Sequence, residues 1–355
     1  MRHQRRLARS AAAALATAAL AVTGLTGLAP SASAAAQACT YRPSQLPVPS
    51  GATAGAVTTV AGKDLFAGEI EYPAASRLTK RHAAIWSGGK VTDLGTVPDA
   101  DYTLGVNDMN ASGTAVGYGW KLTGSSEGWP LGTNYPFRSR DGKLEQLPVP
   151  EGAYGLVAQA ITENGDIYGD GYLTNPNYRE VFFWPADKPG TVTRLKGFPL
   201  GSRVEGVDTD GTVAVTAVND PEGTTRPYLW KDGVAKALTL PSGATNATIS
   251  SISGGTVVGD GQTADFNRFA VTWGKDGQPR KLPDGYGTSA VNSTGLILGT
   301  SGRTHSAKLW QGTSALRTLS GDGQFYTLGD DATLAGANAP AGTSYPRFPA
   351  IWRCS

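Results

Sequence analysis

The two ends of this 355-residue chain complement each other, and this constrains the fold more than any other feature of the sequence. Residues 45–49 read QLPVP, and residues 146–150 read QLPVP again. The second copy closes one unit of an internal repeat, whereas the first copy has no unit before it. The chain stops at AIWRCS, where each earlier unit would continue into such a segment. A ring of repeats closed by the N-terminal strand accounts for both observations.

Each repeat unit combines three recurring segments. A glycine-rich strand comes first, at 65–70, 114–119, 166–171, 212–217, 256–261, 296–301 and 333–338. A strand carrying tryptophan follows, at 84–86, 182–184, 228–230, 271–273, 308–310 and 350–352. In the second unit the matching segment is PFR (136–138), which places Arg138 in the tryptophan position. A third segment ends in Leu, and residues 44–46 supply it for the last unit.

A short innermost strand precedes each glycine-rich strand and leads into turns such as NASG (110–113) and DTDG (208–211). Such Asn-, Asp- and Gly-rich turns favour hairpins. The 47 glycines, and the lack of a helical period after residue 34, also indicate an all-β protein. Four antiparallel strands in each of seven units predict a seven-bladed β-propeller of residues 35–355, with the tryptophans as blade-to-blade core.

The first 34 residues read as a signal peptide. A basic start precedes an apolar stretch, and Ala32-Ser33-Ala34 is an A-x-A cleavage signal. Without the four leader arginines, 27 basic residues stand against 29 acidic ones. This balance argues against nucleic acid as a partner, because phosphate binding needs a concentrated basic surface. We therefore expect a secreted, extracellular monomer with no membrane span. The sequence does not decide whether it is retained at the cell wall.

The two cysteines, Cys39 and Cys354, lie at opposite ends of the mature chain. In an oxidising compartment an even pair predicts a disulfide. A Cys39–Cys354 bond would fasten the ring where its two ends meet, next to Trp352 of the last unit.

One segment carries a family pattern. HAAIWSGGKVTDLG (82–95) resembles the HAF-type extracellular repeat, which runs roughly His-Ala-Phe-x-Trp-x-x-Gly and continues to Asp-Leu-Gly. His82, Trp86 and Asp93 match, and Ala84 stands in place of Phe. The resemblance implies a secreted bacterial repeat protein. It transfers no catalytic residues, because that family has no established common activity.

Connections between the second and third strands vary widely in length, and variable loops on a rigid scaffold are the usual place for recognition. The connection at 120–135 carries Trp120, Trp129 and Tyr135 among Gly, Ser and Thr. Such aromatic side chains suit the binding of sugars or peptides. The alternative is a loop held against its own blade by its tryptophans.

Four arginines recur five residues before a tryptophan: Arg81, Arg179, Arg268 and Arg347. They form a candidate ring of positive side chains for an anionic ligand. The alternative, which we favour, is that these arginines recur because the units derive from one repeat. Each would then pair with a carboxylate or backbone group of a neighbouring blade.

Enzyme signatures are sparse. The mature chain has two histidines, His82 and His305, and no G-x-S-x-G segment, so neither a metal site nor a serine triad is predicted. DTDG alone is a weak calcium signal. Glu205, Asp208 and Asp108 lie on or just after innermost strands and are candidates for a pair of catalytic carboxylates.

The sequence thus favours a non-catalytic binding module without cofactor, whose ligand is a carbohydrate or an extracellular protein. The first alternative is a polysaccharide-active propeller hydrolase or lyase that uses paired carboxylates. A third is a structural protein of the wall or spore. An enzyme should show carboxylates converging in a pocket, whereas a binder should show exposed aromatic side chains on one rim.

Overall fold

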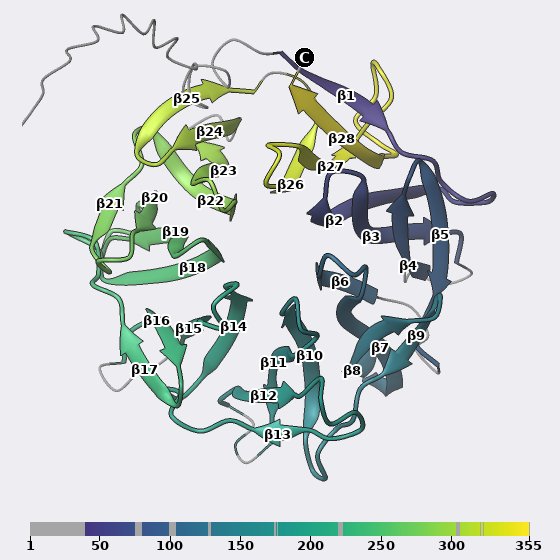
Figure 1. Ribbon diagram of the computed structural model, residues 1–355, viewed down its shortest axis with the longest axis horizontal. Helices are drawn as coiled ribbons and strands as arrows, with labels where there is room; N and C mark the ends of the chain where they lie inside the picture. Colours follow the sequence, from purple (N-terminus) through teal and green to yellow (C-terminus); the bar gives the residue numbers. More distant parts are fainter. Residues whose placement is uncertain are drawn as a thin grey trace, which may run out of the picture.

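The computed structural model describes residues 40–74, 80–98, 104–126, 129–173, 175, 177–218, 223–302, 306–319, 321 and 323–354. Within these residues the strands form seven antiparallel sheets of four strands each, and no helix is present. The sheets stand around a central axis like the blades of a propeller (Figure 1). The seven-bladed fold predicted from the repeat is confirmed.

Each blade is a meander that runs from an innermost to an outermost strand. Blade 1 contains β2 (Ala54–Gly62), β3 (Leu65–Tyr72), β4 (Lys80–Ser87) and β5 (Lys90–Gly95). Blade 2 contains β6 (Leu104–Met109), β7 (Ala115–Ser126), β8 (Trp129–Arg140) and β9 (Lys143–Gln146). Blade 3 contains β10 (Tyr154–Ile161), β11 (Ile167–Tyr172), β12 (Glu180–Trp184) and β13 (Thr193–Arg194). Blade 4 contains β14 (Ser202–Val207), β15 (Val213–Ala217), β16 (Arg226–Lys231) and β17 (Val234–Ala237).

The remaining blades follow the same order. Blade 5 contains β18 (Asn246–Ser253), β19 (Thr256–Gln262), β20 (Arg268–Trp273) and β21 (Pro279–Lys281). Blade 6 contains β22 (Gly285–Val291), β23 (Leu296–Ser301), β24 (Ala307–Gln311) and β25 (Ser314–Thr318). Blade 7 contains β26 (Gln324–Leu328), β27 (Leu334–Asn338), β28 (Phe348–Cys354) and, as its outermost strand, β1 (Tyr41–Gln45).

The N-terminal strand closes the ring, as predicted. β1 pairs antiparallel with β28, with Tyr41 opposite Cys354 and Gln45 opposite Ala350 (Figure 1). The backbone N–H of Leu46 extends this ladder by donating to the carbonyl of Pro349 at 2.9 Å. Cys39 lies outside the described residues, so the Cys39–Cys354 disulfide stays a prediction.

Four tryptophans join neighbouring blades by the same hydrogen bond. In each case the indole N–H of a buried tryptophan donates to a backbone carbonyl at the end of the preceding blade. The acceptor residue directly follows a leucine, which is buried in three cases and half-buried at Leu46. The bonds are Trp86 to Pro47 at 2.7 Å, Trp184 to Pro148 at 2.8 Å, Trp273 to Thr239 at 2.8 Å and Trp310 to Pro283 at 3.1 Å. Two of these carbonyls belong to the two QLPVP segments. The tryptophans therefore form blade-to-blade core, and QLPVP is the segment that receives them.

The prediction that Arg138 takes the tryptophan position is wrong by one residue. In blade 3, Phe182 lies opposite Gly169 and Trp184 opposite Ile167. In blade 2, Phe137 lies opposite Gly117 and Arg138 opposite Val116, so the next residue, Ser139, takes the position that Trp184 has in blade 3. Ser139 is therefore the counterpart of Trp184, and its Oγ accepts the backbone N–H of Ala115 at 2.8 Å.

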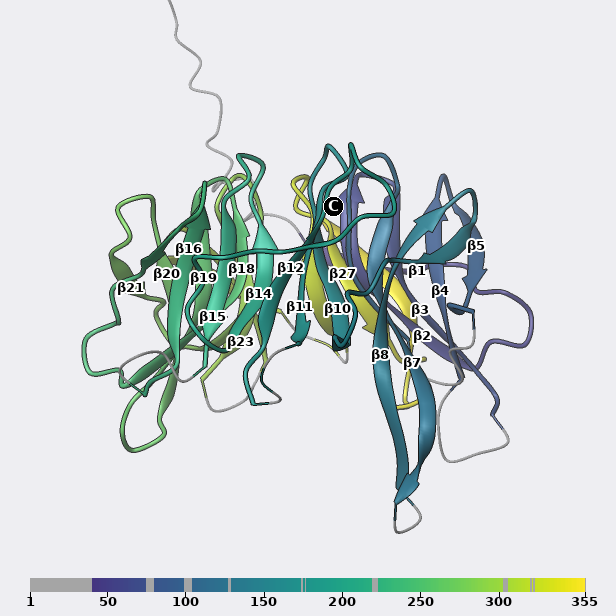
Figure 2. The same cartoon turned by 90° about the horizontal axis from the view of Figure 1, so that it is seen from below.

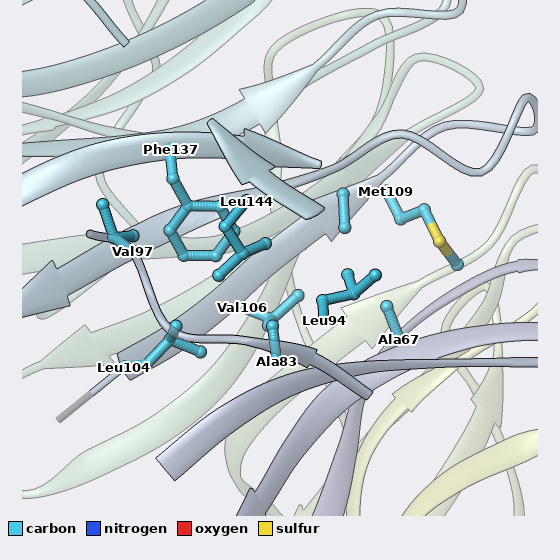
Figure 3. Close-up of a cluster of buried hydrophobic side chains, with 10 residues drawn as sticks. Ala67, Ala83, Leu94, Val97, Leu104, Val106, Met109, Phe137 and Leu144 are labelled. Carbon is cyan, nitrogen blue, oxygen red and sulfur yellow. The ribbon is translucent and has the colours of Figure 1, made fainter. Parts of the chain in front are cut away.

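Phe137 points into the apolar cluster between blades 1 and 2, beside Leu144 and Val97 (Figure 3). Arg138 lies on the other face of β8 and pairs with Glu145, with Nε 3.0 Å from Oε2. A slip of one residue moves a strand side chain to the opposite face, which explains the error.

Most of the connection at 120–135, which the sequence predicted as a loop, is strand. It continues β7 and β8 into a long two-stranded hairpin that projects from one face of the ring (Figure 2). We call this the loop face, because the connections between second and third strands lie there. The turns within each blade lie on the opposite face, here called the turn face.

The signal peptide and secretion stay predictions, because residues 1–39 lie outside the described residues. No helix within the described part of the chain has the length and apolar character needed to cross a membrane.

Removal of a blade-joining tryptophan should destabilise the fold far more than removal of its counterpart in blade 2. Trp184→Ala should lower the free energy of unfolding by about 3–5 kcal/mol, because it opens a cavity between blades. The matched variant Ser139→Ala loses one hydrogen bond and should cost about 1 kcal/mol. Urea unfolding of both variants measures the difference. Equal losses would contradict the role of Trp184 as blade-to-blade core that blade 2 lacks at Ser139.

Candidate functional site

Second strands carry side chains that join one blade to the next. The residue after the central glycine of the strand is Glu69 in blade 1, Asp170 in blade 3 and Asp260 in blade 5. Each carboxylate accepts a backbone N–H from the innermost strand of the following blade: Val106 at 3.3 Å, Val204 at 3.1 Å and Thr288 at 2.9 Å. These carboxylates therefore help to hold the ring together.

Three of the four recurring arginines pair with these carboxylates within their own blade. Arg179 contacts Asp170, and Arg268 contacts Asp260. Arg81 bridges two carboxylates, with Nη1 3.1 Å from Oε2 of Glu69 and Nη2 2.9 Å from Oε1 of Glu71. The arginines thus stand on the loop face as predicted from their spacing, but they do not form one continuous ring.

A pocket of about 300 Å³ opens on the loop face where blade 1 meets blade 7. Its acidic side is Glu69 and Glu71 of β3 with Arg81 of β4. Its other side is formed by blade 7, which contributes Gln324, Tyr326, Ala337, Tyr345 and Arg347. We call this the closure pocket. It brings together Arg81 and Arg347, whereas Arg179 and Arg268 line separate, smaller pockets of about 200 and 240 Å³.

The two glutamates converge because of strand geometry. Residues two apart in a strand point to the same face, with Cα atoms about 6.6 Å apart. Both carboxyl groups are largely covered, with side-chain exposures of 17% for Glu69 and 19% for Glu71. Burial raises the pKa of Glu69, although the Arg81 guanidinium and the Val106 N–H oppose this effect. Sequence reasoning missed this pair, although Glu69 occupies the second-strand position that Asp170 and Asp260 share in blades 3 and 5.

Arg347 is held in place through its backbone. Its carbonyl accepts the N–H of Gly55 on β2 at 2.9 Å, which joins blade 7 to blade 1. A Cβ atom on Gly55 would lie 2.6 Å from the carbonyl oxygen of Glu69 and 3.2 Å from Pro349, so only glycine allows this approach. These main-chain contacts hold the backbone of Arg347 at the junction of blades 7 and 1, where its side chain lines the same pocket as the two glutamates.

Two tyrosines lie close to the acidic side of the pocket. Burial raises the pKa of Tyr118, and the charge of Glu69 raises it further. Burial also raises the pKa of Tyr326, whose hydroxyl donates to Oε1 of Gln324. Both phenols therefore stay protonated at neutral pH and can donate hydrogen bonds.

The aromatic candidates of the blade 2 connection do not converge on this pocket. The Trp120 ring lies against its own hairpin, since a Cβ atom on Gly132 would lie 2.3 Å from it. Tyr135 is half-buried on β8 opposite Gly119. Trp129 begins β8, and its side chain lies outside the described part of the structure.

The carboxylates proposed from the sequence as a catalytic pair are spread over two blades. Asp108 accepts the N–H groups of Met109 at 2.8 Å and of Ile161 at 2.9 Å. Asp208 accepts those of Gly254 at 3.0 Å and Gly255 at 2.6 Å in the next blade. Both are thus blade-joining residues.

Glu205 differs from these two, because it faces Arg203 on its own strand, with Oε1 3.2 Å from Nε. Burial raises its pKa to about 7. Among the described residues, no group of three or more His, Cys, Asp or Glu side chains is arranged to hold a metal ion.

Comparisons with known proteins support the architecture. No protein-family model matches the sequence, and no curated protein matches it. The β-propeller domain of the Trilobed protease from Pyrococcus furiosus matches at 10% identity with a TM-score of 0.57, covering 85% of this chain and 94% of that chain. Pyrococcus horikoshii acylaminoacyl peptidase matches at 10% identity with a TM-score of 0.53, covering 85% of this chain and 51% of that chain.

A puromycin-hydrolyzing peptidase of Mycobacterium tuberculosis matches at 16% identity with a TM-score of 0.46, covering 66% of this chain and 38% of that chain. This chain therefore spans well under two thirds of both peptidases. Similarity at such low sequence identity shows a shared fold and does not assign the activities of those proteins to this chain.

The prediction of a non-catalytic binding module is wrong. The propellers that share its fold with a TM-score above 0.5 belong to a protease and to a peptidase rather than to binding proteins. The geometry agrees with this correction. Two carboxylates converge in a pocket, as set out for an enzyme, whereas Trp120 lies against its own hairpin.

The arginine pairs can be tested by comparing Arg179 with Arg347. Arg179→Met should lower the free energy of unfolding by about 3–5 kcal/mol, because it leaves the fully buried carboxylate of Asp170 without its cation. Combining it with Asp170→Asn should restore most of this loss. Arg347→Met should cost less than about 1 kcal/mol, because the equivalent position of blade 7 is Ala337. Urea unfolding near neutral pH measures all three; equal losses for the two single variants would contradict the assignment.

Proposed function

We propose that this protein is a hydrolase of glycosidic bonds in a polysaccharide, with Glu69 and Glu71 as its two catalytic carboxylates. The observation that carries this proposal is their arrangement: both side chains leave the same face of β3, contact one guanidinium and line an open pocket. Glycosidases use two carboxyl groups separated by roughly 5–9.5 Å. Residues two apart in a strand point to the same face, which directs both carboxyl groups toward one pocket.

Glu69 is assigned as the general acid. Its carboxyl group is raised in pKa by burial, so it holds a proton at a higher pH than an exposed glutamate would. In the reaction this proton passes to the glycosidic oxygen as its bond to the sugar carbon breaks. The leaving group therefore departs as a neutral alcohol.

Glu71 is assigned as the second carboxylate. Its Oε1 accepts hydrogen bonds from Nε of Arg81 at 3.1 Å and from Nη2 at 2.9 Å, which fixes its orientation toward the pocket. As a base it removes a proton from the attacking water, whose oxygen bonds to the sugar carbon. As a nucleophile it would bond to that carbon itself, and water would release the sugar in a second step.

The predicted location is consistent with this substrate class. A leader at residues 1–34 and the resemblance of residues 82–95 to HAF-type extracellular repeats both suggest an extracellular protein, which would meet polysaccharides there. Release into the medium and membership of that repeat class belong to the same proposal.

The first test is hydrolysis by the mature protein. We expect it to release reducing ends from at least one of a panel of soluble neutral and acidic polysaccharides. Glu69→Gln and Glu71→Gln should each lower this rate by at least about 100-fold, because each removes one of the two proton-transfer groups. Glu145→Gln, an exposed glutamate paired with Arg138, is the matched control and should keep full activity. No release from any polysaccharide, or full activity in both pocket variants, would refute the proposal.

The pH dependence separates the two roles. Activity should fall as pH rises through the raised pKa of Glu69, because the general acid must be protonated. On a 4-nitrophenyl glycoside of the same sugar, whose leaving group needs little protonation, Glu69→Gln should regain much of its rate and lose the high-pH decline. Glu71→Gln should stay inactive on it. The reverse pattern would exchange the two roles.

A further inference from the structure

We infer that the sugar bound in the closure pocket carries a carboxylate and that Arg347 binds it. The inference rests on the proposed function for its choice of a sugar substrate. The recognition itself rests on a separate observation, which is the break in the repeat at Ala337. An acidic polysaccharide, built from uronic acid units, is the substrate class that follows.

The repeat supplies an internal comparison for Arg347. In blades 1, 3 and 5 an arginine five residues before the tryptophan pairs with a carboxylate that follows the central glycine of the second strand. Blade 7 keeps the arginine, but the residue after Gly336 is Ala337. The registers are equivalent, since Ala337 lies opposite Pro349 as Asp170 lies opposite Val181. Arg347 has therefore lost the partner that the repeat provides elsewhere.

With this loss, one donor of the Arg347 side chain has no partner in the described part of the chain. Its Nε is buried and has no hydrogen-bond partner among the described residues. Arg347 and Ala337 line the same pocket, so the space that a blade 7 carboxylate would occupy is open to a ligand. An unpaired buried donor costs free energy that a bound carboxylate would recover.

The charges of the pocket also favour an anion in the reactive state. When Glu69 carries its proton as general acid, the charge of Glu71 balances that of Arg81. Arg347 then leaves one positive charge, and no ionised group of the described pocket lining offsets it. The phenol of Tyr326 and the amide of Gln324 add neutral hydrogen-bonding groups beside it.

The test compares matched acidic and neutral probes. Binding of tri-galacturonate and tri-mannuronate to the mature protein is measured by titration calorimetry, each beside its fully methyl-esterified form. We expect at least one acid to bind at least about tenfold more tightly than its ester, the lower bound for a charged hydrogen bond. Arg347→Met should abolish this preference. Arg280→Met, an exposed arginine of the turn face, is the matched control and should keep it.

Ala337→Asp is the decisive variant. It restores in blade 7 the carboxylate found in blades 3 and 5, so the introduced side chain should pair with Arg347 and exclude the acidic probe while the protein stays folded. Equal binding of acid and ester by the unaltered protein, or an acid preference that survives both Arg347→Met and Ala337→Asp, would overturn the inference.

The outcome is separable from that of the proposed hydrolase. Hydrolysis of a neutral polysaccharide that depends on Glu69 and is unchanged in Arg347→Met would leave the hydrolase standing and remove the acidic substrate. Acid binding that depends on Arg347, without release of reducing ends from any acidic polysaccharide, would keep the recognition site and remove the hydrolase.

Discussion

The antiparallel pairing of β1 with β28 is the interaction on which the rest of the molecule depends. It supplies blade 7 with its outermost strand and so brings the last blade into register against the first. The junction is then fastened further, because Gly55 donates to Arg347 at 2.9 Å and Arg353 pairs with Asp64 at 2.7 Å. The pairing also covers the outward edge of β28, which would otherwise be free to pair with another chain. The closure pocket lies at this junction, so its geometry exists only in the closed ring.

Within the ring, polar side chains do much of the blade-to-blade bonding, and this has a physical cost. A buried carboxylate loses its hydration and is tolerated only when cations and N–H groups surround it. Asp170 satisfies this condition with Arg179 and with the N–H of Val204 at 3.1 Å. Blade 4 solves the same problem without charge, since Thr216 accepts the N–H of Ile249 at 3.0 Å. The repeat therefore specifies a position that accepts a hydrogen bond, rather than a particular residue.

The ring and its closure could be predicted because they follow from periodic features of the sequence: the spacing of glycines and tryptophans, and the duplicated QLPVP. The HAF-like residues also have a local explanation, since His82 Nδ1 lies 2.9 Å from Asp93 Oδ1 across neighbouring strands. The placement of Arg138 failed because alignment by neighbouring aromatics slipped one residue, and a strand reverses its faces at each step.

The candidate site was harder to predict than the fold. Arg81 and Arg347 were identified from their spacing, but Glu69 and Glu71 were overlooked because their strand was read only as a glycine repeat. A comparison of the residue after each central glycine would have found Glu69 with Asp170 and Asp260. A comparison between repeat units does not show that blade 1 and blade 7 form one pocket, because residues 69 and 347 lie near opposite ends of the sequence.

Departures from the repeat are where a propeller of this kind can acquire a function. A residue that repeats in all blades is explained by packing, whereas one that breaks the pattern must be explained by something the pattern does not need. Ser139 and Ala337 both break it. Ser139 replaces a tryptophan but recovers a hydrogen bond from Ala115, so its substitution is locally compensated. Ala337 removes the partner of an arginine and leaves a buried donor facing a pocket that also holds two glutamates. The uncompensated departure, Ala337, thus lies at the junction where the ring closes. This junction is the place in the fold where a residue is explained by ligand binding better than by packing.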